Sequence, residues 1–206
     1  MRTKYPDAGW RKYLDFEEYV PFTIGVCRRL ELPGAAPLRI LDIGCGTGLF
    51  LYCARHFGHD AVGIDIENEL MAEMAERFDV DRRIAPVRPF APIGIDGSFD
   101  LITCMGTQFD RVRTEQGRQK WGCEEWHFFL ADLERHLSPT GRLFLRINRG
   151  VEARLQRRYF YNEDVHAALL HGYQRNIEYL FDRQGVARAC ENLQASIGRP
   201  VRPATG

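Results

Sequence analysis

Short apolar runs and amphipathic stretches follow one another along most of the chain. Three apolar runs, residues 38–43, 61–66 and 99–104, have the composition of strands that are buried on both faces of a parallel sheet. Behind the first run, apolar residues recur with the spacing of one helix face, at Phe50, Cys53, Ala54 and Phe57. A strand, a turn and a helix in this order predict an α/β fold with a mostly parallel sheet and helices on both of its faces.

The same patterns predict elements in the rest of the chain. From residue 10 to residue 32 apolar and aromatic residues recur as in a helix, which Pro21 is expected to break into two pieces. Asn68 is a good N-cap residue and predicts the start of the helix behind the second strand. The other predicted elements are a strand at 83–87, a helix at 121–137, a strand at 142–148, a helix at 162–172, a strand at 177–182 and a last strand at 186–190. The C-terminal strand of the sheet is therefore expected to be short.

The length of 206 residues favours a single domain, 1–206, with a core large enough to fold alone. Within it, residues 1–37 are predicted to form an N-terminal helical lid and linker, residues 38–193 the core, and residues 194–206 a flexible tail. The helical lid has two interpretations. Its aromatic side chains either pack the helix on the sheet or line a pocket for an acceptor; they are Trp10, Tyr13 and Tyr19.

A glycine turn follows the first predicted strand. Gly44, Gly46 and Gly48 remove three β-carbons from one loop, which permits positive φ angles and lets a ligand lie against bare backbone. The spacing is G-x-G-x-G, whereas the dinucleotide fingerprint G-x-G-x-x-G would need a glycine at Leu49. Asp42 precedes the turn, where an acid would repel phosphate and suits an ammonium group. The turn therefore favours a ligand with a ribose and a cationic tail, without phosphate.

Asp65 supports the same interpretation. It ends the second predicted strand about 20 residues beyond the turn, where an acid can bind the two hydroxyl groups of a ribose. Four segments in the same order resemble blocks of the class I S-adenosylmethionine-dependent methyltransferases: LDIGCGTG (41–48), VGIDIE (62–67), DGSFDLI (96–102) and LSPTGRLFL (137–145). The resemblance spans residues 38–148 and implies a three-layer Rossmann-like methyltransferase fold.

The resemblance implies S-adenosyl-L-methionine as the cofactor and assigns residues to it. Asp42 and the glycine turn would hold the methionine half and Asp65 the ribose, while Ile66 would pack on the adenine and Met105 would close the far side. Family members often carry an acid or amide behind the third strand for the adenine amino group. Near that position this chain has Phe90, which either stacks on the adenine or packs in the core. The expected cofactor-binding residues are Asp42, Gly44, Cys45, Gly46, Gly48, Asp65, Ile66, Phe90 and Met105.

The loop behind the fourth strand should border the acceptor. It is not of the N-P-P-Y type, which disfavours DNA N-methylation. Residues 111–120 hold four cations against one acid and form either a solvated surface loop or a contact for an anionic group of the acceptor. Asp110 and His127 are the candidate catalytic bases for a hydroxyl acceptor. No metal is expected, because Cys123 and His127 are only two ligands.

Composition limits the partners. The formal net charge is zero and the pI is about 7.0, which gives no general attraction to nucleic acid or to anionic membranes. No apolar run is long enough to cross a bilayer, and the N-terminal residues lack a signal-peptide core. The six cysteines show no C-x-x-C pair and fall mostly in predicted strands and helices, as expected for reduced thiols. A cytoplasmic location is the expectation.

The predicted function is methyl transfer from S-adenosyl-L-methionine to a small-molecule acceptor, with O-methylation of a metabolite or a carrier-borne intermediate as the first choice. Two alternatives stay open at this point. Clusters of arginine at 111–118 and 154–158 keep an RNA or protein methyltransferase open. The missing adenine-site acid and the short C-terminal end keep open a cofactor-binding partner subunit without catalysis.

Overall fold

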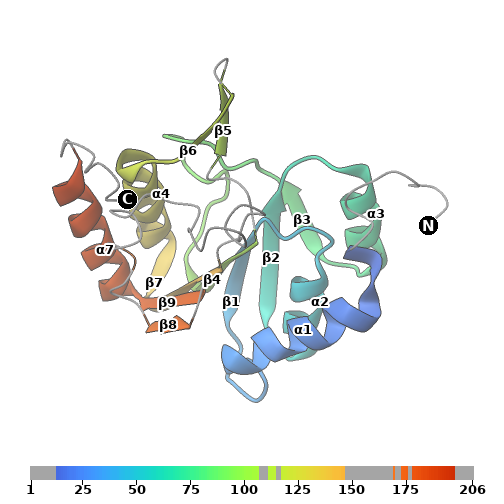
Figure 1. The fold of residues 1–206 in the computed structure, drawn as a ribbon. Coiled ribbons are helices and arrows are strands. Elements are labelled where there is room, and N and C mark those ends of the chain that lie inside the picture. Colours follow the sequence, from blue (N-terminus) through green and yellow to red (C-terminus); the bar gives the residue numbers. More distant parts are fainter. Residues whose placement is uncertain are drawn as a thin grey trace.

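The computed structural model describes residues 13–106, 111–114, 117–146, 169, 173–175 and 178–197, with backbone alone for residues 111–114, 117–120 and 173–175. A seven-stranded sheet forms the centre of the molecule, in the order β3-β2-β1-β4-β7-β9-β8 (Figure 1). Its strands are β1 (Arg39–Ile43), β2 (Asp60–Asp65), β3 (Asp81–Ile84), β4 (Phe99–Met105), β7 (Leu137–Arg146), β8 (Tyr173–Arg175) and β9 (Glu178–Asp182). A separate antiparallel pair consists of β5 (Arg111–Thr114) and β6 (Gly117–Lys120).

The first five strands of the sheet are parallel. The chain runs outward from β1 through β2 to β3, and then returns to place β4 on the other side of β1. This reversal of strand order between β1 and β4 creates a switch point, beyond which ligands bind at the carboxyl ends of the strands. β9 is antiparallel to β7, and the three-residue β8 pairs with it at the outer edge. The predicted α/β fold is confirmed, and the strand expected at 177–182 is found as β9, whereas the outermost strand β8 was not predicted.

In the part of the chain that the structure describes, five helices cover the two faces of the sheet (Figure 1). One core cluster joins α4 and α7 to alternate positions of the strands, among them Leu41, Leu143 and Leu145. The other cluster joins α1 and α2 to the intervening positions, among them Ile40 and Phe144. The sheet is thus the middle of three layers. The helices are α1 (Phe16–Arg29), α2 (Leu49–His56), α3 (Glu69–Arg77), α4 (Cys123–His136) and α7 (Arg183–Ser196).

Side-chain caps begin both α3 and α7. Asn68 caps α3 by accepting a hydrogen bond from the backbone N–H of Met71 at 3.0 Å, as the sequence predicted. Asp182 caps α7 by accepting from the N–H of Gly185 at 2.6 Å. This second cap begins a helix where a last strand was expected. Residues 186–190 are helical because the buried positions of α7 recur every three to four residues, at Gly185, Val186, Ala189, Cys190 and Leu193.

Two further predictions need correction. Pro21 does not divide the N-terminal helical region, because α1 runs from Phe16 to Arg29 with Pro21 inside it. A proline this close to the helix start removes one backbone hydrogen bond, and burial of Val26 and Cys27 against the sheet outweighs that loss. The third strand spans Asp81–Ile84, about two residues earlier than expected.

The C-terminal predictions are tested only in part. The helix expected at 162–172 lies outside the described residues apart from Leu169, which is helical and buried. The helix α7 continues to Ser196, past the point where a tail was expected to begin.

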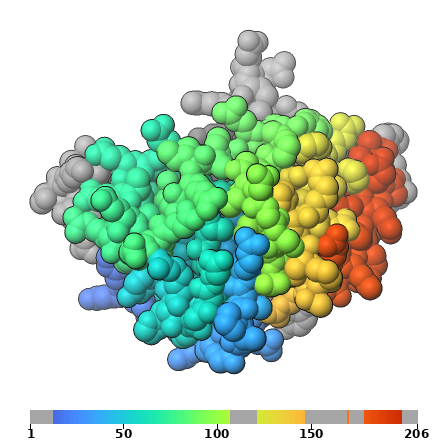
Figure 2. Space-filling view, turned by 180° about the vertical axis from the view of Figure 1, so that it is seen from behind, coloured from blue at the N-terminus to red at the C-terminus, as the bar shows by residue number. Residues whose placement is uncertain are grey.

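Seen from behind, the teal and green residues, which include β2 to β4, adjoin the yellow and red residues of α4, β7 and α7 (Figure 2).

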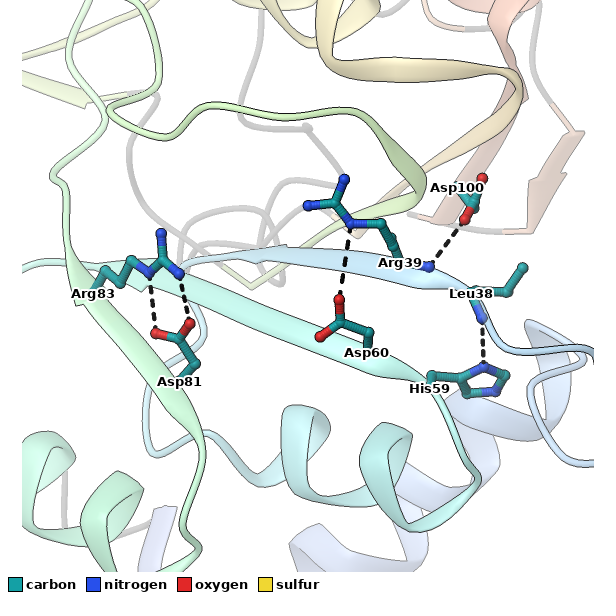
Figure 3. Close-up of polar contacts among 7 residues, drawn as sticks. All are labelled: Leu38, Arg39, His59, Asp60, Asp81, Arg83 and Asp100. Atoms are coloured by element: carbon teal, nitrogen blue, oxygen red, sulfur yellow. Dashed lines mark hydrogen bonds and ion pairs between the residues drawn. The ribbon is translucent and has the colours of Figure 1, made fainter.

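The amino-terminal edge of the sheet is fastened by polar contacts (Figure 3). His59 is 4% exposed; its Nδ1 accepts from the N–H of Leu38 at 3.2 Å, so its Nε2 donates to the carbonyl of Leu32 at 2.9 Å. Asp100 accepts from the N–H of Arg39 at 2.9 Å. These contacts join β1, β2 and β4 where the strands begin.

None of the described helices combines the length and the apolar composition that crossing a membrane requires.

Candidate functional site

The glycine turn lies at the carboxyl end of β1, beside the switch point. Gly44, Gly46 and Gly48 have φ angles of 75°, 56° and 80°, in the region that favours glycine. A β-carbon on Gly46 would meet no atom within 4 Å, so the turn presents bare backbone to open space. A β-carbon on Gly48 would lie 2.5 Å from Cγ2 of Val80, which shows that this glycine is required for close packing at the start of α2.

Asp42 lies on β1 immediately before the turn and is 3% exposed. The hydroxyl of Thr103, its partner in the register of β4, donates to Oδ1 at 2.7 Å. The pKa of the Asp42 carboxyl is raised to about 7, chiefly by burial; the Thr103 hydrogen bond lowers it in part and the nearby Asp65 adds to the rise. A buried acid with one stabilising donor is a site where a cationic group would be bound favourably.

Asp65 ends β2, and its carboxylate contacts both the glycine turn and Ile66, the first residue after β2. Its Oδ2 accepts from the N–H of Gly46 at 2.6 Å, and its Oδ1 accepts from the N–H of Ile66 at 2.7 Å. Arg82 on β3 contacts the carbonyl oxygens of the same two residues, with Nε to Gly46 at 3.1 Å and Nη2 to Ile66 at 2.5 Å. The glycine turn and the end of β2 are therefore held together by an anion and a cation.

Cys45 and Met105, two further residues expected in the site, lie close to the turn. Cys45 is buried, and a β-carbon on Gly63 would lie 2.5 Å from its Cβ, so it fills the space between the turn and β2. Burial raises the pKa of the Cys45 thiol. Met105 ends β4 and is partly buried against the core cluster of α1 and α2, which also includes Cys45.

Ile66 and Phe90 both have large exposed fractions. Ile66 is 46% exposed beside the turn, where an apolar ligand group could cover it. Phe90 is 55% exposed, has a left-handed φ of 56°, and makes an edge contact with Phe128 of α4 at 6.1 Å between ring centroids. Phe90 is therefore not part of the buried core, so the core-packing alternative is wrong, and stacking on the adenine stays a prediction.

Of the two candidate bases, Asp110 lies outside the described residues. His127 is half-buried on α4, and no polar contact among the described residues joins it to the glycine turn. Residues 111–120 do not form an irregular loop over their described part, because β5 and β6 pair there as antiparallel strands.

Sequence reasoning missed two residues of this region. Thr103 had a detectable signal, because it is a lone hydroxyl in an apolar strand that pairs with β1. Arg82 had none, because its contacts depend on the register between β3 and β2. Among the described residues, no group of three or more histidine, cysteine, aspartate or glutamate side chains could hold a metal ion.

Fold and site together define an α/β protein with a candidate nucleoside-binding site made of acids and bare backbone. A family model described as "Methyltransferase domain" matches residues 40–141. This match and the relatives below support a class I S-adenosylmethionine-dependent methyltransferase, with S-adenosyl-L-methionine as the cofactor. The open space at Gly46 and the two acids fit a ribose-bearing, cationic ligand of this kind.

Two curated methyltransferases and one solved structure are similar to this chain. A ubiquinone biosynthesis O-methyltransferase of Xanthomonas campestris is 36% identical over 85 residues, covering 39% of this chain and 34% of the relative. A glycine/sarcosine N-methyltransferase of Halorhodospira halochloris is 27% identical over 173 residues, covering 82% and 56%. The chain thus spans about a third to somewhat over half of these relatives. The PH0226 protein of Pyrococcus horikoshii has the same fold, with a TM-score of 0.53 at 14% identity over 93% of this chain and 89% of that one.

Proposed function

We propose that this chain transfers the methyl group of S-adenosyl-L-methionine to a small-molecule acceptor, by O-methylation of a metabolite or of a carrier-borne intermediate. The observation that carries the proposal is the bare glycine turn between two acids at the switch point of the sheet. The name of the Xanthomonas relative, an O-methyltransferase, supports the choice of oxygen.

The residues at the turn are assigned as follows in the proposal. Asp42 faces the ammonium group of the methionine half, since a buried carboxylate gains most from a nearby cation. The glycine turn lies along the same half through its backbone. Asp65 binds the ribose hydroxyl groups, and Ile66 covers the adenine. Cys45 packs beneath the turn, Met105 borders the methyl group, and Phe90 is proposed to stack on the far side of the adenine.

The contribution of the chain to the reaction is alignment. The bound cofactor supplies a methyl group that its sulfonium already activates. The protein's residues fix the position of the donor and exclude water, and alignment of two reactants can lower a barrier by about 7–11 kcal/mol. For a hydroxyl acceptor, Asp110 and His127 are the proposed bases, because that proton must leave as the oxygen attacks.

An anionic acceptor is part of the proposal, and Arg146 supports it. Arg146 ends β7 beside Met105 at the end of β4. Its guanidinium lies 4.2 Å from the ring centroid of Phe22 and 3.8 Å from a carboxylate oxygen of Glu178. Arg29 contacts the same oxygen at 3.0 Å, so two cations share one acid. Burial lowers the pKa of Arg146, as expected where positive charge is incompletely solvated. A carboxylate or phosphate of the acceptor would balance the excess charge.

A cytoplasmic location is the last part of the proposal. Cys27, Cys45, Cys53 and Cys190 are free thiols, a state that a reducing compartment maintains.

Transfer of a labelled methyl group tests the function. The purified chain is incubated with labelled S-adenosyl-L-methionine and a metabolite extract, and labelled products are separated by charge and analysed for the methylated atom. A labelled, anionic O-methyl product is expected. Label on nitrogen, on RNA or on protein would contradict the proposed acceptor, and no transfer to any fraction with intact cofactor binding would favour a non-catalytic subunit.

Arg146 provides the test of the acceptor's charge. Once an acceptor is known, Arg146→Met is expected to raise its KM about tenfold, as the loss of one charge-assisted hydrogen bond would. The affinity for S-adenosylhomocysteine should stay the same. Arg188→Met on α7, which removes an exposed cation 3.9 Å from Asp182, is the matched control. Equal KM values for the two variants would reject Arg146 as an anion contact.

A further inference from the structure

Arg82 lies on β3 and contacts both the glycine turn and Ile66, the first residue after β2. It lies on β3 opposite Gly63 of β2, and its side chain reaches past β2 to the glycine turn. Its Nε donates to the carbonyl oxygen of Gly46 at 3.1 Å and its Nη2 donates to that of Ile66 at 2.5 Å. These carbonyl groups belong to segments 20 residues apart in the sequence, which one guanidinium therefore joins.

The carboxylate of Asp65 joins the same two residues through their N–H groups, at 2.6 Å from Gly46 and 2.7 Å from Ile66. At both residues the N–H thus donates to an anion and the carbonyl accepts from a cation. Hydrogen bonds to ionised groups are about twice as strong as neutral ones. The bond from Gly46 to Asp65 and the two bonds from Arg82 link the glycine turn to the end of β2. They add to the backbone bonds that the N–H groups of Gly44 and Cys45 donate to the carbonyl of Ile64, at 2.7 and 3.2 Å.

This arrangement matters when a ligand binds to Asp65. Both of its oxygens already accept from backbone N–H groups, so ribose hydroxyl groups bind at the second lone-pair site of each oxygen or displace the N–H of Gly46. Displacement would break the contact between Asp65 and the glycine turn. The contact of Arg82 with the carbonyl of Gly46 does not use the carboxylate and remains in place.

We propose that Arg82 is a positioning residue that holds the glycine turn against the end of β2 while Asp65 binds the ribose of the cofactor. The role rests on the proposed function of Asp65. An arginine suits it because the planar guanidinium donates to two carbonyl groups at once, whereas a lysine ammonium is a single point charge. No acid or amide follows the third strand at the position expected to bind the adenine. The contribution of β3 to the site is instead the pair of hydrogen bonds from Arg82 to Gly46 and Ile66.

The test compares neighbouring arginines. Arg82→Met, Arg82→Lys and Arg83→Met are made in the full chain, and S-adenosylhomocysteine is titrated into each by calorimetry, with thermal melting in parallel. Arg83 is the control because it is an exposed arginine beside Arg82 that contacts Asp81 at 3.0 and 2.7 Å (Figure 3). Its loss changes the net charge equally without touching either turn.

The expected result is a loss of affinity of about 10- to 100-fold for Arg82→Met, since two hydrogen bonds to a charged group are removed. Arg82→Lys should lose less, and Arg83→Met should stay within about twofold, the range of exposed ion pairs. In an Asp65→Ala background, Arg82→Met should have a much smaller effect, because no ribose contact remains to be supported. A merely structural arginine would not produce this dependence on Asp65.

Each other outcome overturns the role. Unchanged affinity in Arg82→Met, an equal loss in Arg83→Met, or a lower melting temperature without loss of affinity would each do so. If Arg82→Met does not fold, Arg82→Lys decides, and its unchanged affinity would reject the proposal. A wild-type chain that does not bind S-adenosylhomocysteine would instead contradict the cofactor assignment itself.

Discussion

Polar side chains act in opposite ways at the two ends of the sheet, the amino edge where the parallel strands begin and the carboxyl edge where they end. The strand β2 shows the difference within one strand. It begins with Asp60 and ends with Asp65. Asp60 has a side chain that is 80% exposed and lies 3.8 Å from Arg39, at an edge where His59 and Asp100 also join neighbouring strands (Figure 3). Asp65 is half-buried and accepts two backbone hydrogen bonds from turns.

The surroundings of the two acids differ as well. At the carboxyl edge, a buried Asp42 lies close to Asp65, and Ile66 and Ile84 expose 46% and 62% of their surface. Acids that are close together and buried are costly, and apolar side chains beside them gain from being covered. The amino edge thus stabilises the fold, whereas the carboxyl edge keeps groups whose interactions improve when a ligand binds.

The largest expected effect is on cofactor affinity, from Asp65→Ala. The loss of the carboxylate that is proposed to bind two ribose hydroxyl groups should weaken binding of S-adenosylhomocysteine about 100-fold, because hydrogen bonds to charged groups contribute about 1.5–3 kcal/mol each. Isothermal titration measures it. The free energy of unfolding should fall much less, and unchanged affinity would reject Asp65 as the ribose ligand.

A change at His59 should act on stability alone. His59→Ala leaves the N–H of Leu38 and the carbonyl of Leu32 without their partner, which should lower the free energy of unfolding by about 2–3 kcal/mol. Urea denaturation measures this loss. The exposed His56 on α2 supplies the control variant, His56→Ala, with a change below about 0.5 kcal/mol. A large loss of cofactor affinity in His59→Ala would contradict the separation of the two edges.

Asp42 sharpens the comparison through pH. Its pKa is raised from 3.8 to about 7, so the folded protein binds this proton more tightly than the unfolded chain. The stability that this provides is fully present below about pH 4 and is lost as the pH rises through about 7. Asp42→Asn keeps an acceptor for Thr103 and cannot ionise. Its free energy of unfolding, measured in urea, should exceed that of the wild type at about pH 8 by much more than at about pH 5.

The same carboxyl group should link cofactor binding to protons. An ammonium group favours the carboxylate, so affinity for S-adenosylhomocysteine should rise about tenfold from about pH 6 to pH 8 in the wild type. In Asp42→Asn it should be weaker and nearly independent of pH. Calorimetry in buffers of different ionisation enthalpy would also report the released proton, and parallel pH profiles for the two proteins would count against a contact with the ammonium group.

The smallest effect is expected from Asp60→Ala, the counterpart of Asp65→Ala at the other end of β2. An exposed ion pair at 3.8 Å contributes at most about 0.5 kcal/mol, and no ligand group is proposed there. Urea denaturation and titration should therefore both give wild-type values. If Asp60→Ala weakened cofactor binding as strongly as Asp65→Ala, the effect would come from net charge and not from the site.

The fold of the first half could be predicted because its signals are local. The strand predicted at 38–43 is found at Arg39–Ile43, and the cap at Asn68 is confirmed. The second half was harder. The sequence of residues 186–190 is as compatible with a short strand as with a helix. In the structure β9 pairs with β7, and residues 186–190 belong to α7, which packs on a face of the sheet. Pro21 likewise remains helical because packing outweighs one lost hydrogen bond.

By itself, the sequence determined the bare turn, the acids on either side of it and the family to which they point, because these are features of consecutive residues. Only the tertiary structure decided that Thr103 donates to Asp42 and that Arg82 joins Gly46 to Ile66. Thr103 and Asp42 are 61 residues apart, and Arg82 and Gly46 are 36 apart. Such contacts depend on the register of parallel strands, which is set when the whole sheet assembles around its core and is not encoded in any local pattern.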